Sequence, residues 1–305
     1  MEGAPDLHAT ALANMHRHRK SASMSKAFQV PLSVLESLSP KSRQCVENLG
    51  VHQPGEIDIP NFAVLAAVLV LLYEKSGELR VLLTTRSKLL RAHPGETALP
   101  GGKVDKDDAS LVFTAFREAN EEVGLPTRSP SIFTVSVLRP FLSNKKVVVR
   151  PVIAFLDDLS LLDKLRANEA EVAHIFDHPL EAMLDPAIAL QEALVEKGST
   201  DWPYEEELHN TDDRRLAFLG NATYRMHRFR STASPVKGLT AEMLMTVAEV
   251  AYDRPPSFER YAPEQMTDFT AVLRALEQAE HGEQIHASGT STPIGVATNV
   301  IHGAP

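Results

Sequence analysis

The feature that most constrains the fold is an uninterrupted apolar run of 12 residues, Phe62 to Tyr73. A helix that crosses the hydrocarbon core of a membrane needs about 20 residues, so this run is too short for one. A run of this length with flanking turn residues is typical of a strand that is buried on both faces. The turn residues Glu74 to Glu78 and the second apolar run Leu79 to Thr85 follow it. The three segments together predict a strand–turn–strand unit in the core of a sheet.

The rest of the chain alternates between strand-like and helix-like segments. Runs with strand character lie at 132–138, 147–155, 171–176 and 223–230. Helical spacing of apolar residues lies at 30–49, 110–123, 180–184 and 240–252. Strands mixed with a few helices indicate an α/β sandwich built on a mixed sheet.

Composition at the two ends and in one internal stretch indicates the domain limits. Residues 1–28 and 282–305 are expected to form a mobile leader and a mobile tail. One domain is expected over 29–281. Within it, residues 186–213 are acidic and are interpreted as an irregular insertion loop.

Charge and cysteine content limit the classes of function. The formal net charge of -9 argues against a surface that coats nucleic acid, because such a surface needs many Lys and Arg to displace counterions. Cys45 is the only cysteine, so no internal disulfide can form, which fits a reducing compartment. We therefore expect an intracellular protein that binds neither nucleic acid nor membrane; peroxisomal, mitochondrial and cytoplasmic locations stay open, as does the oligomeric state.

The clearest functional signal is the segment Gly102 to Leu125. Its apolar residues recur at helical spacing, so one face is expected to pack inward. Asp108 or Ser110 is expected to cap the start of the helix, and Gly124 supplies its left-handed end. At about 100° per residue, Glu118, Glu121 and Glu122 lie on one face of this helix.

Three carboxylates on one helix face are suited to binding a hard divalent cation. Glu118 and Glu122 are like charges four residues apart, an arrangement that costs an isolated helix a few tenths of a kcal/mol. A cation such as Mg²⁺ reverses that repulsion, and it usually keeps several water ligands when it meets substrate phosphates. A carbonyl at Gly101 can add a neutral oxygen ligand, because the Gly101-Gly102 pair permits a close backbone approach. The alternative for such a charged patch alone is a solvated helix face.

The segment closely resembles the Nudix box, in which a glycine and a spacer precede R-E-apolar-x-E-E-x-G-apolar. The match is complete from Arg117 to Leu125. The spacer here is one residue longer than in the common box, so Lys103 and Ala109 fall where the leading glycine and the first glutamate would lie. Asp107 or Asp108 is expected to replace that glutamate as the partner of Arg117. The resemblance implies a Nudix α/β/α sandwich.

A second motif, Leu82 to Gly102, reads LLTTRSKLLRAHPGETALPGG. It resembles the signature of coenzyme A diphosphatases, with Leu99 in the place of a phenylalanine. The GGK-x-D start and the Gly238-Leu239-Thr240-Ala241 segment are similar to eukaryotic peroxisomal members of that family. The forked guanidinium groups of Arg86 and Arg91 suit phosphate oxygens. The expected substrate-binding residues are Arg86, Arg91, Gly95, Gly102 and Lys103.

The resemblance implies Mg²⁺- or Mn²⁺-dependent hydrolysis of coenzyme A, or of a derivative, to 3',5'-ADP and 4'-phosphopantetheine. The expected metal ligands are Glu118, Glu122, Glu121 and the carbonyl of Gly101. Glu121 or Glu118 is the expected general base, with Glu169 and Glu171 as alternatives from a distant loop. Arg117 is grouped with the catalytic residues because it orients the glutamates.

Three alternatives follow from the same residues. The first is a Nudix hydrolase that acts on another nucleoside diphosphate derivative, and the second is a non-catalytic coenzyme A sensor. The third is a protein-interaction module that uses the acidic loop 205–207 with Trp202 and Tyr204, for which a plain insertion is the simpler interpretation. The histidines lack zinc-site spacing and are interpreted as ordinary core or surface residues: His174, His178, His209 and His227.

Overall fold

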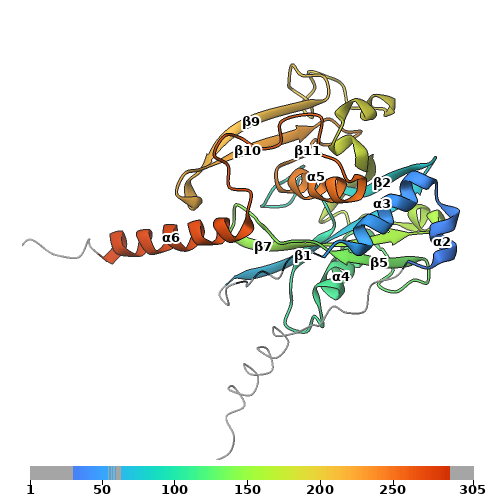
Figure 1. Ribbon diagram of the computed structural model, residues 1–305, viewed down its shortest axis with the longest axis horizontal. Helices are drawn as coiled ribbons and strands as arrows, with labels where there is room; N and C mark the ends of the chain where they lie inside the picture. The colour runs from blue at the N-terminus through green and yellow to red at the C-terminus, as the bar shows by residue number, and fades with distance from the viewer. Residues whose placement is uncertain (1–29, 54, 56, 58, 60–62, 289–305) are drawn as a thin grey trace, which may run out of the picture.

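The computed structural model describes residues 30–288 apart from 54, 56, 58 and 60–62. The expected leader therefore lies outside the described residues, as does the tail beyond Ser288. The chain forms a central mixed sheet with helices on both faces and a second, smaller sheet beside it (Figure 1). The predicted α/β sandwich is confirmed.

The central sheet has eight strands, five of which follow the order β3-β2-β1-β7-β5. Strands β1 and β7 are parallel, and the other pairs are antiparallel. Off this path, β4 pairs with β1, β6 pairs with β7, and β8 pairs with β2. The strands are β1 (Val64–Lys75), β2 (Glu78–Arg86), β3 (Thr97–Ala98), β4 (Gly101–Lys103), β5 (Ile132–Val137), β6 (Phe141–Leu142), β7 (Val147–Leu156) and β8 (Val172–Pro179).

The apolar run that predicted a buried strand forms β1, which is covered on both faces. Its alternate residues Ala67, Leu69 and Leu71 pack with apolar residues of helix α4 (Leu111–Val123). The intervening Val70 and Leu72 pack against helices α3 (Pro40–Val51) and α5 (Gly238–Tyr252), which lie on the opposite face. A strand with helices on both faces has no polar side, and this explains the absence of alternation in its sequence. The short helix α2 (Leu32–Ser37) precedes α3, as the helical spacing of the N-terminal segment predicted.

The second sheet consists of β9 (His209–Leu216), β10 (Ala222–Phe229) and β11 (Val236–Lys237), and it leads directly into α5 (Figure 1). The prediction that residues 186–213 are irregular was wrong at its C-terminal end, where β9 begins. The acidic residues there do not prevent a strand, because they form ion pairs with β10. Asp213 pairs with Arg225 at 2.7 Å and Asp212 with Arg228 at 3.0 Å.

The other connections contain short 3₁₀ helices. They are η1 (Leu159–Lys164), η2 (Leu180–Met183), η3 (Pro186–Gln191) and η4 (Ala217–Leu219). Trp202 is fully buried, and its indole N–H donates to the carbonyl of Glu206 at 2.7 Å. This tryptophan therefore anchors its own loop and is not exposed for docking, whereas the acidic residues 205–207 of the same hypothesis are exposed.

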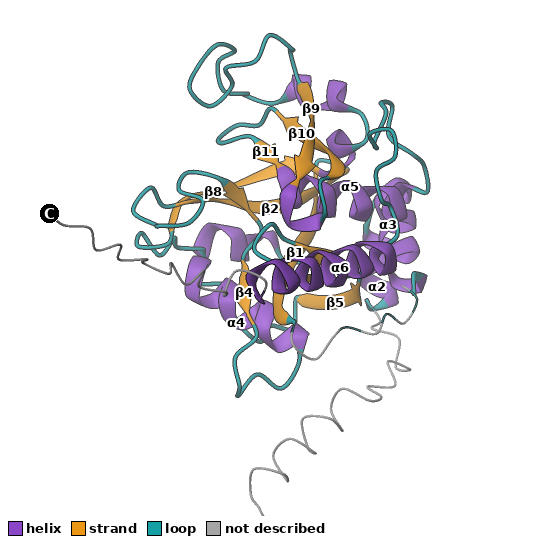
Figure 2. Cartoon of the chain, turned by 90° about the vertical axis from the view of Figure 1, so that its left-hand side faces the viewer, coloured by secondary structure: helices purple, strands orange, loops and turns teal. Residues whose placement is uncertain are grey.

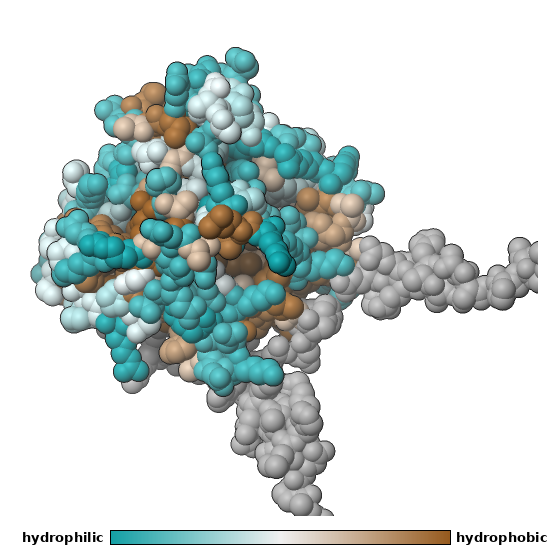
Figure 3. All heavy atoms as spheres, turned by 180° about the vertical axis from the view of Figure 1, so that it is seen from behind, coloured by the Kyte–Doolittle hydropathy of each residue, from teal (hydrophilic) through white to brown (hydrophobic). Residues whose placement is uncertain are grey.

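Helix α6 (Phe269–Ser288) runs past the expected start of the tail at Gly282 (Figure 2). Phe269 and Leu273 on its first turns are buried against Val148 of the central sheet. No helix within the described ranges combines the length and apolar character that a membrane span requires. The face in Figure 3 is mostly hydrophilic, with apolar side chains gathered in small patches around a hollow.

Candidate active site

Helix α4 carries the glutamates, and its two ends are fixed by local contacts. The side chain of Ser110 accepts a hydrogen bond from the N–H of Phe113 at 3.1 Å, which makes Ser110 the N-cap and settles the choice with Asp108. Gly124 ends the helix with φ 70°, and Leu125 behind it is fully buried. These caps fix the rotation of the helix and therefore the direction of its carboxylates.

Arg117 is held by a ring of acceptors on the loop before the helix. Its guanidinium donates to both carboxylate oxygens of Asp108 at 2.9 and 3.0 Å and to the carbonyl of Lys103 at 3.2 Å. Asp108, rather than Asp107, therefore fills the position expected for the missing glutamate. The arginine holds the pKa of Asp108 at about 2, well below its usual 3.8. Arg117 also pairs with Glu118 at 3.0 Å, which is the expected orienting role.

Glu118 lies directly against the backbone of Gly102. A Cβ on Gly102 would lie 2.3 Å from Oε1 of Glu118, so a larger residue cannot occupy this position without displacing the carboxylate. The neighbouring Gly101 lies equally close to β1, where a Cβ would lie 2.4 Å from the carbonyl oxygen of Ala67. Burial raises the pKa of Glu118, and Glu121 and Glu171 raise it further, whereas Arg117 lowers it. The glycine pair thus forms a cradle for this carboxylate.

Glu122 is the most buried of the three glutamates, with 5% of its surface exposed. Burial raises its pKa to about 8, against the opposing effects of Arg86 and of the Gly101 N–H. The charges of Glu118 and Glu171 raise this pKa as well. Three carboxyl groups therefore lie close enough to repel one another in a partly buried site.

Glu171 reaches the site from the loop before β8. The backbone of this loop is hydrogen-bonded to the end of α4, with the N–H of Asn168 donating to the Glu122 carbonyl at 2.9 Å. The carbonyl of Glu171 accepts from the N–H of Ser87 at 2.8 Å, next to Arg86. Of the two distant carboxylates expected as alternatives for the base, Glu171 is the one whose charge acts on both Glu118 and Glu122.

Glu121 occupies a different position from the other two glutamates. Half of its side chain is exposed, at 52%, and it pairs with Arg117 at 3.3 Å. It is still near enough to Glu118 to raise the pKa of that residue. Within the described ranges, no three His, Cys, Asp or Glu side chains are placed to hold a metal ion by themselves. Any cation here must take part of its coordination from backbone oxygen, water or substrate.

A cavity of about 760 Å³ opens beside this site. Gly101, Gly102 and Lys103 line it together with Arg86, so four of the residues expected in the site share one space. Arg91 is exposed and Gly95 lies in a turn at φ 71°, and the cavity lining as described includes neither. The structure therefore brings Arg86 to the cavity and leaves Arg91 at the surface.

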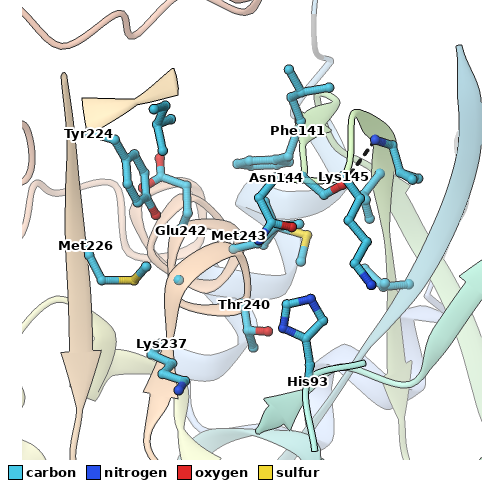
Figure 4. Close-up of a pocket in the computed structure, with 18 of the residues that line it drawn as sticks. His93, Phe141, Asn144, Lys145, Tyr224, Met226, Lys237, Thr240, Glu242 and Met243 are labelled. Carbon is cyan, nitrogen blue, oxygen red and sulfur yellow. Dashed lines mark hydrogen bonds between the residues drawn. The ribbon is translucent and has the colours of Figure 1, made fainter. Parts of the chain in front are cut away.

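The opposite wall of the cavity comes from the C-terminal third of the chain (Figure 4). Tyr224 and Met226 project from β10, and Glu242 and Met243 project from the first turns of α5. The sequence did not indicate these residues, because they lie about a hundred positions or more after the box. The Gly238 to Ala241 segment was the one signal near them. Its Thr240 lines the cavity and hydrogen-bonds to the carbonyl of Thr97 at 3.3 Å.

Three of the four histidines lie in packed environments. His209 and His227 are hydrogen-bonded to each other at 3.0 Å and stack in a cluster with Phe229 and Phe258. His178 is fully buried, and burial lowers its pKa to about 4. His174 on β8 is exposed and pairs in register with Thr85 of β2.

Comparison with known proteins identifies the family. The family profile described as "NUDIX domain" matches residues 64–197. The chain is 39% identical to "Nudix hydrolase 15, mitochondrial" of Arabidopsis thaliana over 65% of this chain and 62% of that protein. It is 30% identical to "Peroxisomal coenzyme A diphosphatase NUDT7" of Mus musculus over 63% of this chain and 72% of that protein.

Among solved structures, a C. elegans Ap4A hydrolase is 21% identical over 40% of this chain and 84% of its own, with a TM-score of 0.33. The chain matches about three fifths of the length of two Arabidopsis thaliana relatives, 62% and 59%. The profile covers the sheet, α4 and the loop that carries Glu171. With this profile match and the extended identity to several Nudix proteins, the chain belongs to the Nudix family.

Proposed function

We propose that this protein hydrolyses the diphosphate bond of coenzyme A or of one of its derivatives, with Mg²⁺ or Mn²⁺ as cofactor. The products are 3',5'-ADP and 4'-phosphopantetheine. The observation that carries the proposal is the gathering of Glu118, Glu122 and Glu171 beside a glycine cradle, next to a large cavity that Arg86 and Lys103 line.

The donor set fits a hard divalent cation. Carboxylate oxygens are the ligands that Mg²⁺ prefers, and the raised pKa of Glu122 reflects burial and neighbouring negative charge that a cation would relieve. Glu118 and Glu122 would hold the ion, with the carbonyl of Gly101 as a neutral ligand and Glu121 as a water-mediated partner. When bound, the ion would neutralise charge on the diphosphate and acidify a water molecule.

Residues of the chain supply the general base for hydrolysis of the diphosphate bridge. Water adds to one phosphorus of the bridge, the bond from that phosphorus to the bridging oxygen breaks, and the bridging oxygen leaves with the other product. The proton of the attacking water passes to a carboxylate. We assign this base to Glu171, because its loop is fixed to α4 and Ser87 while its side chain is exposed and free to meet water. Glu121 and Glu118 are the alternatives within the box.

Three further observations support coenzyme A as the substrate. Arg86, from the segment that resembles the coenzyme A diphosphatase signature, lines the cavity together with the glycine pair. One relative bears the name of a coenzyme A diphosphatase. The residues that line the cavity include both Gly102 and residues of β10. A cavity with such a lining suits a substrate with bulky groups on both sides of its diphosphate.

The decisive experiment is mass-resolved product analysis with coenzyme A and either Mg²⁺ or Mn²⁺. We expect equimolar 3',5'-ADP and 4'-phosphopantetheine. A parallel panel of nucleoside triphosphates, NADH and ADP-ribose tests the alternative substrates, and faster turnover of any of these would refute the assignment. Binding of coenzyme A without turnover would indicate a sensor instead.

The base is tested by a matched pair of substitutions in one loop. Glu171→Gln should lower kcat by about 10²-fold, the scale of losing a general base. Glu169→Gln changes an exposed neighbour in the same loop and should leave kcat within about 2-fold. Equal activity of the two variants would move the assignment back to the box glutamates.

A further inference from the structure

The cavity is basic although the protein as a whole is acidic. Seven Arg and Lys residues and two Glu residues line it, whereas the whole chain has a formal charge of -9. Such a local reversal of charge attracts and holds a ligand with several negative charges. The number of cations exceeds what a diphosphate alone requires.

Four of the seven cations pair with protein carboxylates. Lys237 pairs with Glu96 at 3.2 Å, Arg139 lies 3.8 Å from Glu242, and Arg214 and Arg228 share Asp212 at 2.7 and 3.0 Å. The other three are Arg86, Lys103 and Lys145. Arg86 and Lys103 adjoin the glycine pair and the box, where the diphosphate is proposed to bind.

Lys145 is the surplus cation. It is exposed, and no carboxylate in the described part of the chain forms an ion pair with it. It lies at the tip of the β6–β7 hairpin, across the cavity from the loop that carries His93 (Figure 4). Both side chains point into the same part of the cavity in this view.

The hairpin fixes the position of Lys145 by a closed set of backbone contacts. The N–H of Ser143 donates to the carbonyl of Val147 at 2.9 Å, and the N–H of Lys146 donates back to the carbonyl of Ser143 at 3.0 Å. The side chain of Ser143 also accepts from the N–H of Val147 at 3.1 Å. A flexible ammonium on a rigid turn is a suitable point-charge contact for a phosphate group.

His93 adds a second group on the other side of that space. Its Nδ1 is hydrogen-bonded to Glu96 at 2.8 Å, and Nε2 has no hydrogen-bond partner in the described part of the chain. An imidazole held in this way can donate from one nitrogen or the other according to its tautomer. The pair Lys145 and His93 therefore offers one full positive charge and one further polar contact.

We propose that Lys145, assisted by His93, binds the 3'-phosphate of the substrate and thereby selects coenzyme A over nucleotides that carry a diphosphate alone. This inference rests on the proposed function, since coenzyme A has a monoester phosphate on its ribose in addition to its diphosphate bridge. In this proposal Arg86 and Lys103 bind the diphosphate bridge, and Lys145 binds the 3'-phosphate. Lys145 is a specificity-determining residue and takes no part in bond cleavage.

The test compares two substrates that differ in one group, coenzyme A and dephospho-coenzyme A. We expect Lys145→Ala to lower kcat/KM for coenzyme A by about 10-fold, the effect of losing one charge-assisted hydrogen bond, and to change that for dephospho-coenzyme A by less than about 2-fold. Lys145→Arg should keep most of the preference. Lys146→Ala is the matched control, because this lysine is adjacent in the hairpin and is absent from the cavity lining as described.

A binding measurement separates this inference from the proposed reaction. Wild-type protein should bind 3',5'-ADP about 10-fold more tightly than AMP, and Lys145→Ala should abolish most of that difference in calorimetric titrations. An equal loss for both nucleotides, or for both substrates, would overturn the inference and place Lys145 at a shared group. If wild-type protein cleaves neither substrate, the proposed function fails, while the nucleotide titrations still decide whether Lys145 binds the 3'-phosphate.

Discussion

The two walls of the cavity differ in how their charges are used. The first wall, formed by Arg86, Gly101, Gly102 and Lys103 and called the box wall, lies against Glu118, and burial raises the pKa of Glu118 and of the nearby Glu122. On the C-terminal wall, the charged groups are paired, and the lining between them is apolar or aromatic, as at Tyr224, Met226 and Met243. Uncompensated charge is costly in a folded protein unless a ligand or ion offsets it. From this difference we infer that the first wall serves bond cleavage and the second wall serves substrate binding.

This contrast predicts that substitutions on the two walls change different kinetic constants. Substitutions on the box wall should lower kcat, because they act on groups needed in the transition state. Substitutions on the C-terminal wall should raise KM and leave kcat nearly unchanged, because they remove binding that is equal in the ground and transition states.

The largest effect is expected from Glu122→Gln. The amide keeps the size of the side chain but removes the charge that would hold the cation, so kcat should fall by about 10²-fold or more with saturating Mg²⁺. The free energy of unfolding should not decrease, because a buried carboxylate with a pKa of about 8 is replaced by a neutral group.

Glu47→Gln, on the exposed side of α3, is the control and should be neutral. The kcat of Glu122→Gln is measured with coenzyme A by product chromatography. A wild-type kcat in this variant would show that the glutamates beside the box wall are not needed for the reaction.

A second effect, on the order of 10- to 100-fold in kcat, is expected from Gly102→Ala. The added methyl group would lie 2.3 Å from Oε1 of Glu118, so the carboxylate must move, and a displacement near 1 Å can cost that much. Gly50→Ala is a matched control, because its Cβ would have no neighbour closer than 3.9 Å. Steady-state kinetics with thermal melts for both variants would show whether the loss is local. If the loss of kcat parallels the loss of thermal stability in both variants, the proposal that Gly102 positions Glu118 is wrong.

Much of the box wall could be predicted from the sequence because its constraints are local. Cap residues, helical spacing and the length of one apolar run determine α4 and β1. The longer spacer limited the partner of Arg117 to Asp107 or Asp108, and the structure shows that it is Asp108. The C-terminal wall depends on contacts between distant segments. Strand β9 was missed because its charged residues are paired across the sheet with Arg225 and Arg228, which no local pattern records.

The substrate residues show the same limit. Arg86 and Arg91 are both arginines in one motif, but only the fold distinguishes the cavity-lining residue from the exposed one. The turn at Lys145 could be recognised from its residues, whereas the direction of its side chain depends on how β6 and β7 join the sheet. Side-chain direction across a cavity is a tertiary property that spacing along the chain does not encode.

A smaller effect, about 2 kcal/mol in the free energy of unfolding at pH 7, is expected from Asp108→Asn. The folded pKa of Asp108 is about 2 and its usual value is 3.8, so the ionised group stabilises the fold above about pH 4. That contribution is lost as the pH falls through 2. The difference between wild type and variant in urea unfolding should therefore be constant from pH 5 to 8 and shrink below about pH 4. A difference that does not change with pH would show that the pair with Arg117 is not its source.

The smallest effect, about 5-fold in KM with kcat within about 2-fold, is expected from Met226→Ala on the C-terminal wall. The substitution removes contact with an apolar part of the substrate worth about 1 kcal/mol, and this contact is the same before and during bond cleavage. Met226 projects from β10 into the cavity (Figure 4). Leu190→Ala, at an apolar side chain that is 57% exposed elsewhere on the surface, controls for general loss of apolar area. A fall in kcat with unchanged KM would contradict the distinction between the two walls, because the C-terminal wall would then contribute to the transition state.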